Sequence, residues 1–133
     1  MSPQARAGGD VWGPRADDVL AAMIAYFSKG NIPASPLKIH KVIYNLRTRY
    51  KDLLGEFLFP SNTRDPFSKR LERALFGLEI AGLLGTLNPT FEIYQITEEA
   101  KRQSRAIFLT KFDSKTQKKI KALARDFETA LCA

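Results

Sequence analysis

The sequence predicts a mostly α-helical domain with one small β-hairpin. Apolar residues recur every three or four positions in several windows, which is the spacing of one face of a helix. Past the middle of the chain, the turn residues Asn88-Pro89-Thr90 precede an aromatic and β-branched run, which indicates a hairpin. A length of 133 residues suits a single hydrophobic core.

The first helix is expected over residues 17–28. Asp17 and Asp18 suit the positive N-terminal end of a helix, and Gly30 can end it. Before this helix, residues 1–15 mix Gly, Pro, Ala and polar residues without periodicity, and we expect a flexible arm there. The core-facing stripe of the helix is predicted to contain Val19, Leu20, Met23, Ile24 and Phe27.

The second helix is expected to begin at Ser35-Pro36, because serine caps a helix and proline fits its first position. It should extend to about Tyr50. Residues 31–33, just before it, suffice only for a turn or a minimal strand, and the apolar residues 56–59 after it fit a brief strand or a buried loop. Its buried face is predicted to contain Ile39, Val42, Ile43, Leu46 and Tyr50.

The central helix is expected over residues 64–85, with Asp65 as its N-cap and Pro66 in its first position. Its core stripe is predicted to contain Phe67, Leu71, Leu75, Leu78 and Gly82. On the opposite side, Lys69, Arg70 and Arg73 should offer cations to solvent, whereas Phe76 and Ile80 should be buried against a second layer.

A hairpin is expected to follow the central helix. Gly82 and Gly85 flank a leucine pair, Leu83-Leu84, that should be buried. The chain should then turn at residues 88–90 and return as a strand over residues 91–96.

Two further helices are predicted in the C-terminal part. Thr97 can cap a helix that continues to about Phe108, and the chain restarts near Asp113. The last helix has an apolar stripe of Ile120, Leu123, Ala124, Phe127 and Leu131. We therefore expect residues 103–133 to form a basic amphipathic segment that packs on the domain or forms a dimer.

Charge is distributed unevenly along this basic chain. The net charge is +7, with residues 101–133 carrying nine Lys or Arg against three Asp or Glu. Basic surfaces of this kind suit nucleic-acid phosphates. The single cysteine and single histidine exclude a disulfide framework and a structural zinc set of Cys and His, and no apolar run is long enough to span a bilayer. We expect a cytoplasmic protein without cofactors or metals.

The predicted order of helix, short turn, helix, helix and hairpin is that of a winged-helix domain. The run IHKVIYNLRTRY, residues 39–50, resembles the LxKLIYL helix of Panacea (antitoxin-like) and phage-associated helix-turn-helix domains. The run DPFSKRLERALFGLEIAGLLG, residues 65–85, resembles their GPYSxxLxxALxxLxxxGLI segment. FEIYQITEEAKR, residues 91–102, is similar to the hairpin strand and the step after it in winged helices, including MarR-like and PadR-like regulators.

The resemblance implies a winged helix-turn-helix over residues 16–102 with additional C-terminal helices. It implies a transcriptional regulator or antitoxin-like repressor that binds double-stranded DNA, with the helix from Asp65 in the major groove. Such proteins are often homodimers, here through the C-terminal helices, and their half-sites lie about one DNA turn apart. The residues expected to contact DNA are Lys38, Lys41, Arg64, Ser68, Lys69, Arg70, Arg73, Asn88 and Thr90.

Other functions remain open. Winged helices also serve as protein-interaction modules without sequence-specific DNA binding. A third possibility is a non-specific phosphate surface in the tail, formed by Lys101, Arg102, Arg105, Lys111, Lys115, Lys118, Lys119 and Lys121. We do not expect an enzyme, because no nucleophile motif surrounds His40 and the glycines form no phosphate-binding loop.

Overall fold

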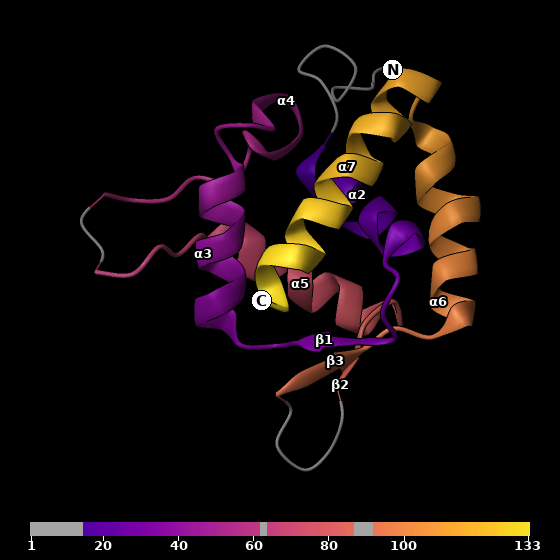
Figure 1. Ribbon diagram of the computed structural model, residues 1–133, viewed down its shortest axis with the longest axis horizontal. Coiled ribbons are helices and arrows are strands. Elements are labelled where there is room, and N and C mark those ends of the chain that lie inside the picture. Colours follow the sequence, from indigo (N-terminus) through magenta and orange to yellow (C-terminus); the bar gives the residue numbers. More distant parts are fainter. Residues whose placement is uncertain (1–14, 62–63, 87–91) are drawn as a thin grey trace.

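The computed structural model describes residues 15–61, 64–86 and 92–133, which form six α-helices and one small antiparallel sheet (Figure 1). The prediction of a mostly α-helical domain with a small β-hairpin is confirmed. The arm expected at residues 1–15 lies outside the described residues except for Arg15.

Helix α2 (Ala16–Met23) continues as the 3₁₀ segment η1 (Ile24–Tyr26), and its predicted apolar stripe is buried. Helix α3 (Pro36–Leu46) begins where expected, with the Ser35 hydroxyl accepting from the Lys38 N–H at 3.3 Å.

Helix α3 ends earlier than predicted. After Leu46 the chain makes a turn, Tyr50 leaves the helical conformation, and the short helix α4 (Lys51–Leu54) follows. The Tyr50 hydroxyl donates to Asp126 at 2.5 Å, a contact 76 residues away that no local pattern encodes. The predicted extension of the helix to Tyr50 is therefore wrong at the residue that makes this long-range contact.

Helix α5 (Lys69–Ile80) begins three residues later than expected. Ser68, not Asp65, is its N-cap, and the Ser68 hydroxyl accepts from the Leu71 N–H at 3.2 Å. Both residue types cap helices well, and in the structure the Ser68 N–H also donates to His40 Nδ1 inside the protein. The helix ends at Ile80, and Gly82 two residues later has a φ of 80°, a left-handed conformation that favours glycine.

The expected burial of Phe76 and Ile80 is wrong. Their relative exposures are 62% and 71%, because no described element covers the solvent side of α5. The C-terminal tail, which could have packed there, packs against α2 and α3 instead.

The sheet consists of β1 (Asn31–Pro33), β2 (Gly85–Thr86) and β3 (Ile93–Gln95) in the order β1-β3-β2. The predicted hairpin is confirmed as the antiparallel pair β2 and β3, in which Thr86 lies opposite Tyr94. The turn or minimal strand expected at residues 31–33 is strand β1, and it pairs with the other edge of β3.

The C-terminal part is helical, as expected. Helix α6 (Glu98–Gln103) begins at the Thr97 cap and continues as a π-helical segment, η2 (Ser104–Phe108), and a 3₁₀ segment, η3 (Leu109–Lys111). Helix α7 (Ser114–Leu131) begins at the Asp113 cap, where the carboxylate accepts from the Thr116 N–H at 2.8 Å.

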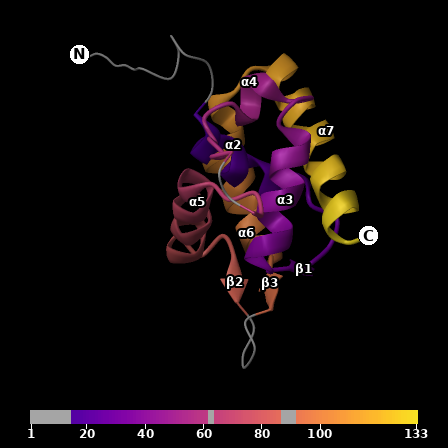
Figure 2. The same cartoon turned by 90° about the vertical axis from the view of Figure 1, so that its left-hand side faces the viewer.

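Helix α7 belongs to the same core as the first helices. It crosses the front of the molecule between α3 and α6 (Figure 1), and its whole predicted apolar stripe is buried. The stripe is therefore used inside this domain, and the homodimer expected through the C-terminal helices stays a prediction. Figure 2 shows α5 and α7 on opposite sides of the molecule, with α3 between them.

Candidate functional site on helix α5

The residues predicted to contact DNA fall into three groups. Lys41, Arg64, Lys69 and Arg73 are exposed, Lys38 is half-buried, and no described residue forms an ion pair with any of these side chains. Asn88 and Thr90 lie outside the described residues. The remaining two, Ser68 and Arg70, have side chains that are engaged by other groups of the protein.

Ser68 was expected on the groove-facing side and is instead fully buried. Its hydroxyl caps α5, and its backbone N–H donates to His40 Nδ1 at 2.9 Å. Ser68 therefore forms part of the contact between α3 and α5.

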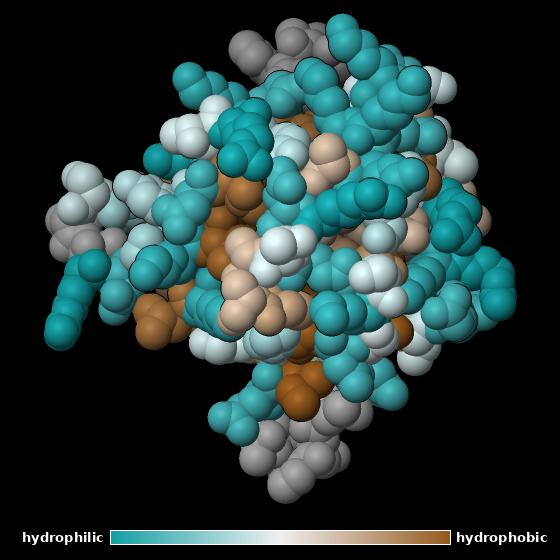
Figure 3. All heavy atoms as spheres, viewed as in Figure 1, coloured by the Kyte–Doolittle hydropathy of each residue, from teal (hydrophilic) through white to brown (hydrophobic). Residues whose placement is uncertain are grey.

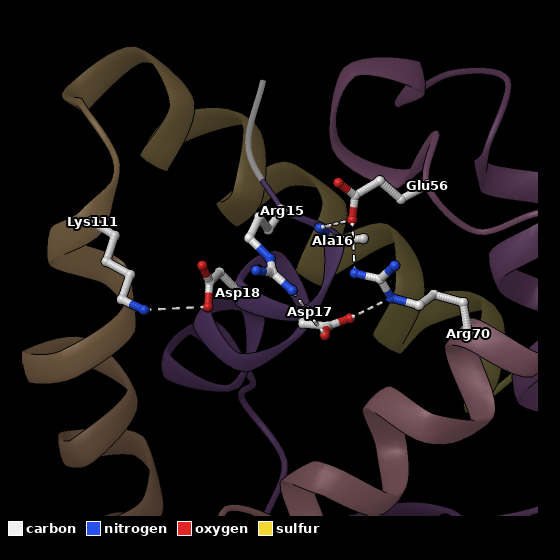
Figure 4. Close-up of polar contacts among 7 residues, drawn as sticks. All are labelled: Arg15, Ala16, Asp17, Asp18, Glu56, Arg70 and Lys111. Atoms are coloured by element: carbon white, nitrogen blue, oxygen red, sulfur yellow. Dashed lines mark hydrogen bonds and ion pairs between the residues drawn. The ribbon is translucent and has the colours of Figure 1, made fainter. Parts of the chain in front are cut away.

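Arg70 was also expected in the groove, but it is held within the protein. Its guanidinium donates to Asp17 Oδ1 and to Glu56 Oε1, both at 3.2 Å, and Figure 4 shows it between the two carboxylates. The same Glu56 oxygen accepts from the Ala16 N–H at 2.9 Å. Arg70 thus joins α5 to the start of α2 and to the loop after α4.

The solvent face of α5 changes character along its length. At about 100° per residue, Lys69, Arg73, Phe76 and Ile80 lie on one stripe opposite the buried Leu71, Ala74 and Leu78. The first half of the stripe is cationic and the second half is apolar.

An open hollow of about 380 Å³ lies beside this stripe, between α3, α5 and β3. Glu72, Glu79 and Tyr94 supply much of its polar lining, and Pro36, Leu75 and Phe76 supply its apolar lining. Arg73 and His40 also line it. The hollow therefore combines two carboxylates and one guanidinium with an apolar wall.

Tyr94 is the best-defined polar group in the hollow. Its hydroxyl donates to Glu79 Oε2 at 3.2 Å. Burial raises the pKa of Tyr94 to about 12, and the negative charge of Glu79 adds to this effect. The phenol therefore stays protonated at neutral pH and holds the Glu79 carboxylate at the edge of the hollow.

His40 has a structural role at the base of α5. Its ring is buried and stacks on the Phe67 ring, with centroids 4.6 Å apart and planes within 7° of each other. Its Nδ1 accepts from the Ser68 N–H, so this nitrogen is unprotonated and the ring is neutral. Burial lowers the pKa of His40, and the charge of Glu72 offsets part of this effect.

The lowered pKa of His40 predicts a loss of stability in mild acid. The unfolded chain binds a proton near the usual pKa of 6.5, whereas the folded chain does so only at lower pH. The free energy of unfolding is therefore expected to fall as the pH drops from 6.5 toward the folded-state pKa. Urea unfolding at several pH values measures this decrease.

The matched variant for this prediction is His40→Asn, because the Asn Oδ1 replaces Nδ1 as the acceptor for the Ser68 N–H and does not titrate. The variant should lose less stability than the parent chain over the same pH interval. Equal losses in the two proteins would mean that His40 does not contribute.

Most cations of the tail are paired. Lys101 binds Glu98 at 3.3 Å and Lys119 binds Asp52 at 2.7 Å. Lys111 binds Asp18 at 3.3 Å (Figure 4). Arg102 pairs with Glu99, and Arg105 donates to the Ala25 carbonyl at 3.4 Å. The exposed remainder of the predicted phosphate surface consists of Lys115, Lys118 and Lys121. Arg125, which is not among the predicted residues, lies on the same helix face.

The described residues contain no group of three or more His, Cys, Asp or Glu side chains placed to hold a metal ion. Within the same residues, no helix has the length and apolar composition needed to cross a bilayer.

Comparison of the chain with protein-family models gives no match, and comparisons with curated proteins and with solved structures give none either. The resemblance to winged-helix regulators therefore remains a prediction.

Proposed function

We infer that this chain is a winged-helix module whose α5 face binds a segment of another protein. The order α2, β1, α3, α5, β2, β3 supports the winged-helix assignment, with α5 in the position of the recognition helix. The chemistry of the α5 surface favours a protein partner over the major groove of DNA.

The observation that carries this proposal is the exposure of Phe76 and Ile80. They lie about one turn apart on the solvent stripe, next to the apolar wall of the hollow. Contiguous exposed apolar surface of this kind is typical of protein-interaction sites. A base-reading helix relies on polar and charged side chains, because the thymine methyl is the main apolar feature of the major groove.

The two carboxylates beside the apolar half of the stripe favour a partner that carries positive charge there. Glu72 and Glu79 are seven residues apart, so they lie on the same side of α5 about 10 Å from each other. A partner segment with apolar side chains and a Lys or Arg could pack on Phe76 and place its cation near either carboxylate. We therefore propose a basic amphipathic segment as the partner.

DNA binding through α5 is the second candidate. It is favoured by the four exposed cations Lys41, Arg64, Lys69 and Arg73, for which no described residue supplies an ion pair. Against it, Glu72 is exposed beside Lys69 and Arg73 on the same helix, where it would repel phosphates.

A display library of random peptides about 16 residues long, roughly four helical turns, tests the proposal. Selected peptides are expected to carry apolar residues at helical spacing together with Lys or Arg. The Phe76→Ala/Ile80→Ala variant should bind them about tenfold more weakly or worse, because both anchors are lost. Its free energy of unfolding should change by no more than about 0.5 kcal/mol, because both side chains are exposed.

Leu58→Ala is the control, since Leu58 is 74% exposed but lies in the loop after α4, away from the hollow. It should leave peptide binding unchanged. Selected peptides that are acidic, or that bind the double variant normally, would contradict the proposal. Light scattering of the intact chain tests whether the α5 face binds a second copy of the chain. A dimer that the Phe76→Ala/Ile80→Ala variant no longer forms would mean that this face is a dimer interface and does not bind a basic segment.

A further inference from the structure

The outward face of α7 carries a concentrated positive charge that the proposed function does not use. Lys115, Lys118, Lys121 and Arg125 are exposed, on the side of the helix away from the buried stripe. Ala122 and Thr129 complete this face, so it contains no carboxylate. We call these four cations the α7 basic face.

The α7 basic face is not used for internal ion pairing. Among the described residues, no hydrogen bond or ion pair engages the side chains of Lys118, Lys121 or Arg125. Lys115 lies near the Asp113 carboxylate that caps the helix. Hydrogen bonds from Thr116 are the main cause of the lowered pKa of that carboxylate, and the charge of Lys115 adds to this effect. The acids nearest in sequence to Arg125 are engaged elsewhere, because Asp126 accepts from Arg49 and Glu128 from Ser28.

These cations do not serve helix stability either. Lys115 and Lys118 lie in the first turns of α7, where the helix dipole is unfavourable to positive charge. The four positive charges also repel one another, because they lie within ten residues, or about 15 Å, along one helix. An external anion would offset both the unfavourable interaction with the helix dipole and the repulsion among the four cations.

The residues around the α7 basic face indicate which kind of anion it binds. None of the exposed large hydrophobic side chains among the described residues lies on α7, and Figure 3 shows mainly hydrophilic residues on the side of the molecule that α7 crosses. Protein interfaces depend on apolar and aromatic anchors, and helices at a membrane surface need an apolar face to insert. Phosphate contacts need neither.

We propose that the α7 basic face binds the phosphate backbone of nucleic acid without reading its sequence. About 15 Å of a DNA duplex carries roughly nine phosphates, enough to engage all four cations. The site lies on the side of the molecule opposite α5 (Figure 2), so it is independent of the proposed protein partner, and both can be bound together.

The experiment is a salt series of binding to a mixed-sequence DNA duplex. The test variant is Lys115→Gln/Lys118→Gln/Lys121→Gln/Arg125→Gln, and the matched control is Lys41→Gln/Arg64→Gln/Lys69→Gln/Arg73→Gln. Both remove four exposed positive charges, so their net charges are equal. Circular dichroism and urea unfolding check that both variants keep the parent fold.

The α7 variant is expected to bind at least about tenfold more weakly in low salt. The slope of log affinity against log salt should become less steep by up to about 3.6, which is about 0.9 for each of four phosphate contacts. The control should retain most of the affinity. The proposal fails if the control loses as much as the α7 variant, if the intact chain does not bind at low salt, or if one duplex sequence is strongly preferred. It also fails if anionic phosphatidylserine vesicles bind more tightly than the duplex.

Discussion

A chain that ends before Lys115 is expected to be unfolded. Helix α7 contributes to the core four large side chains that are each at most 5% exposed: Ile120, Leu123, Phe127 and Leu131. Burying such side chains stabilises by roughly 1.5–3 kcal/mol each, so their removal costs on the order of 10 kcal/mol. This is comparable to the whole stability of a small domain.

The truncation also uncovers the surfaces against which α7 packs. The Phe127 ring stacks on the Phe27 ring with centroids 5.9 Å apart, and α7 covers sides of both α2 and α3. Circular dichroism should show loss of helix well beyond the deleted residues, and urea should give no cooperative transition. The control is a chain that ends after Leu131, which should unfold like the parent. A cooperative transition in the shorter chain would contradict this account.

This result would limit how DNA binding can be assigned to the tail. Loss of binding by the truncated chain would report unfolding and not the removal of phosphate contacts. The α7 basic face therefore has to be tested by substitution of its exposed side chains.

The second large effect is expected at Glu128. This side chain is 6% exposed, and its carboxylate accepts three hydrogen bonds: from the Ser28 N–H at 3.2 Å, the Ser28 hydroxyl at 3.0 Å and the Lys29 N–H at 2.8 Å. Glu128→Ala leaves these donors without their partner and removes a charge-assisted network. We expect a loss of about 2–4 kcal/mol in the free energy of unfolding, measured with urea.

Two variants show whether hydrogen bonding causes that loss. Glu128→Gln keeps one acceptor oxygen and should fall between the parent and Glu128→Ala. Glu98→Ala removes an exposed carboxylate that pairs with Lys101, and it should cost less than about 1 kcal/mol. If Glu128→Ala cost no more than Glu98→Ala, the carboxylate network would not be a major source of stability.

Much of the fold could be predicted from local patterns. The caps Ser35 and Thr97 are where the sequence places them, the last helix begins near Asp113 as expected, and the apolar stripe of α7 is buried throughout. These features depend on residues within a few positions of one another. The end of α3 could not be predicted in this way, because Tyr50 contacts Asp126 in a helix that is distant in sequence.

The surface of α5 was only partly predictable for the same reason. Periodicity identifies a stripe opposite the core, but it does not say whether another element covers that stripe. Arg70 looked exposed because Asp17 and Glu56 are remote in sequence, and Phe76 looked buried because it is apolar. Arg125 was missed although it follows Lys118 by seven residues, a spacing that places both on one helix face.

The bonds from Glu128 to Ser28 and Lys29 also bear on how the chain folds during synthesis. About 100 residues separate these partners, so the N-terminal end of the domain cannot complete its contacts until almost the whole domain has been made. Until then α2 and α3 present uncovered apolar sides to the cell. We therefore expect the nascent domain to complete its fold only after α7 has left the ribosome, and to expose these apolar sides to chaperones until then.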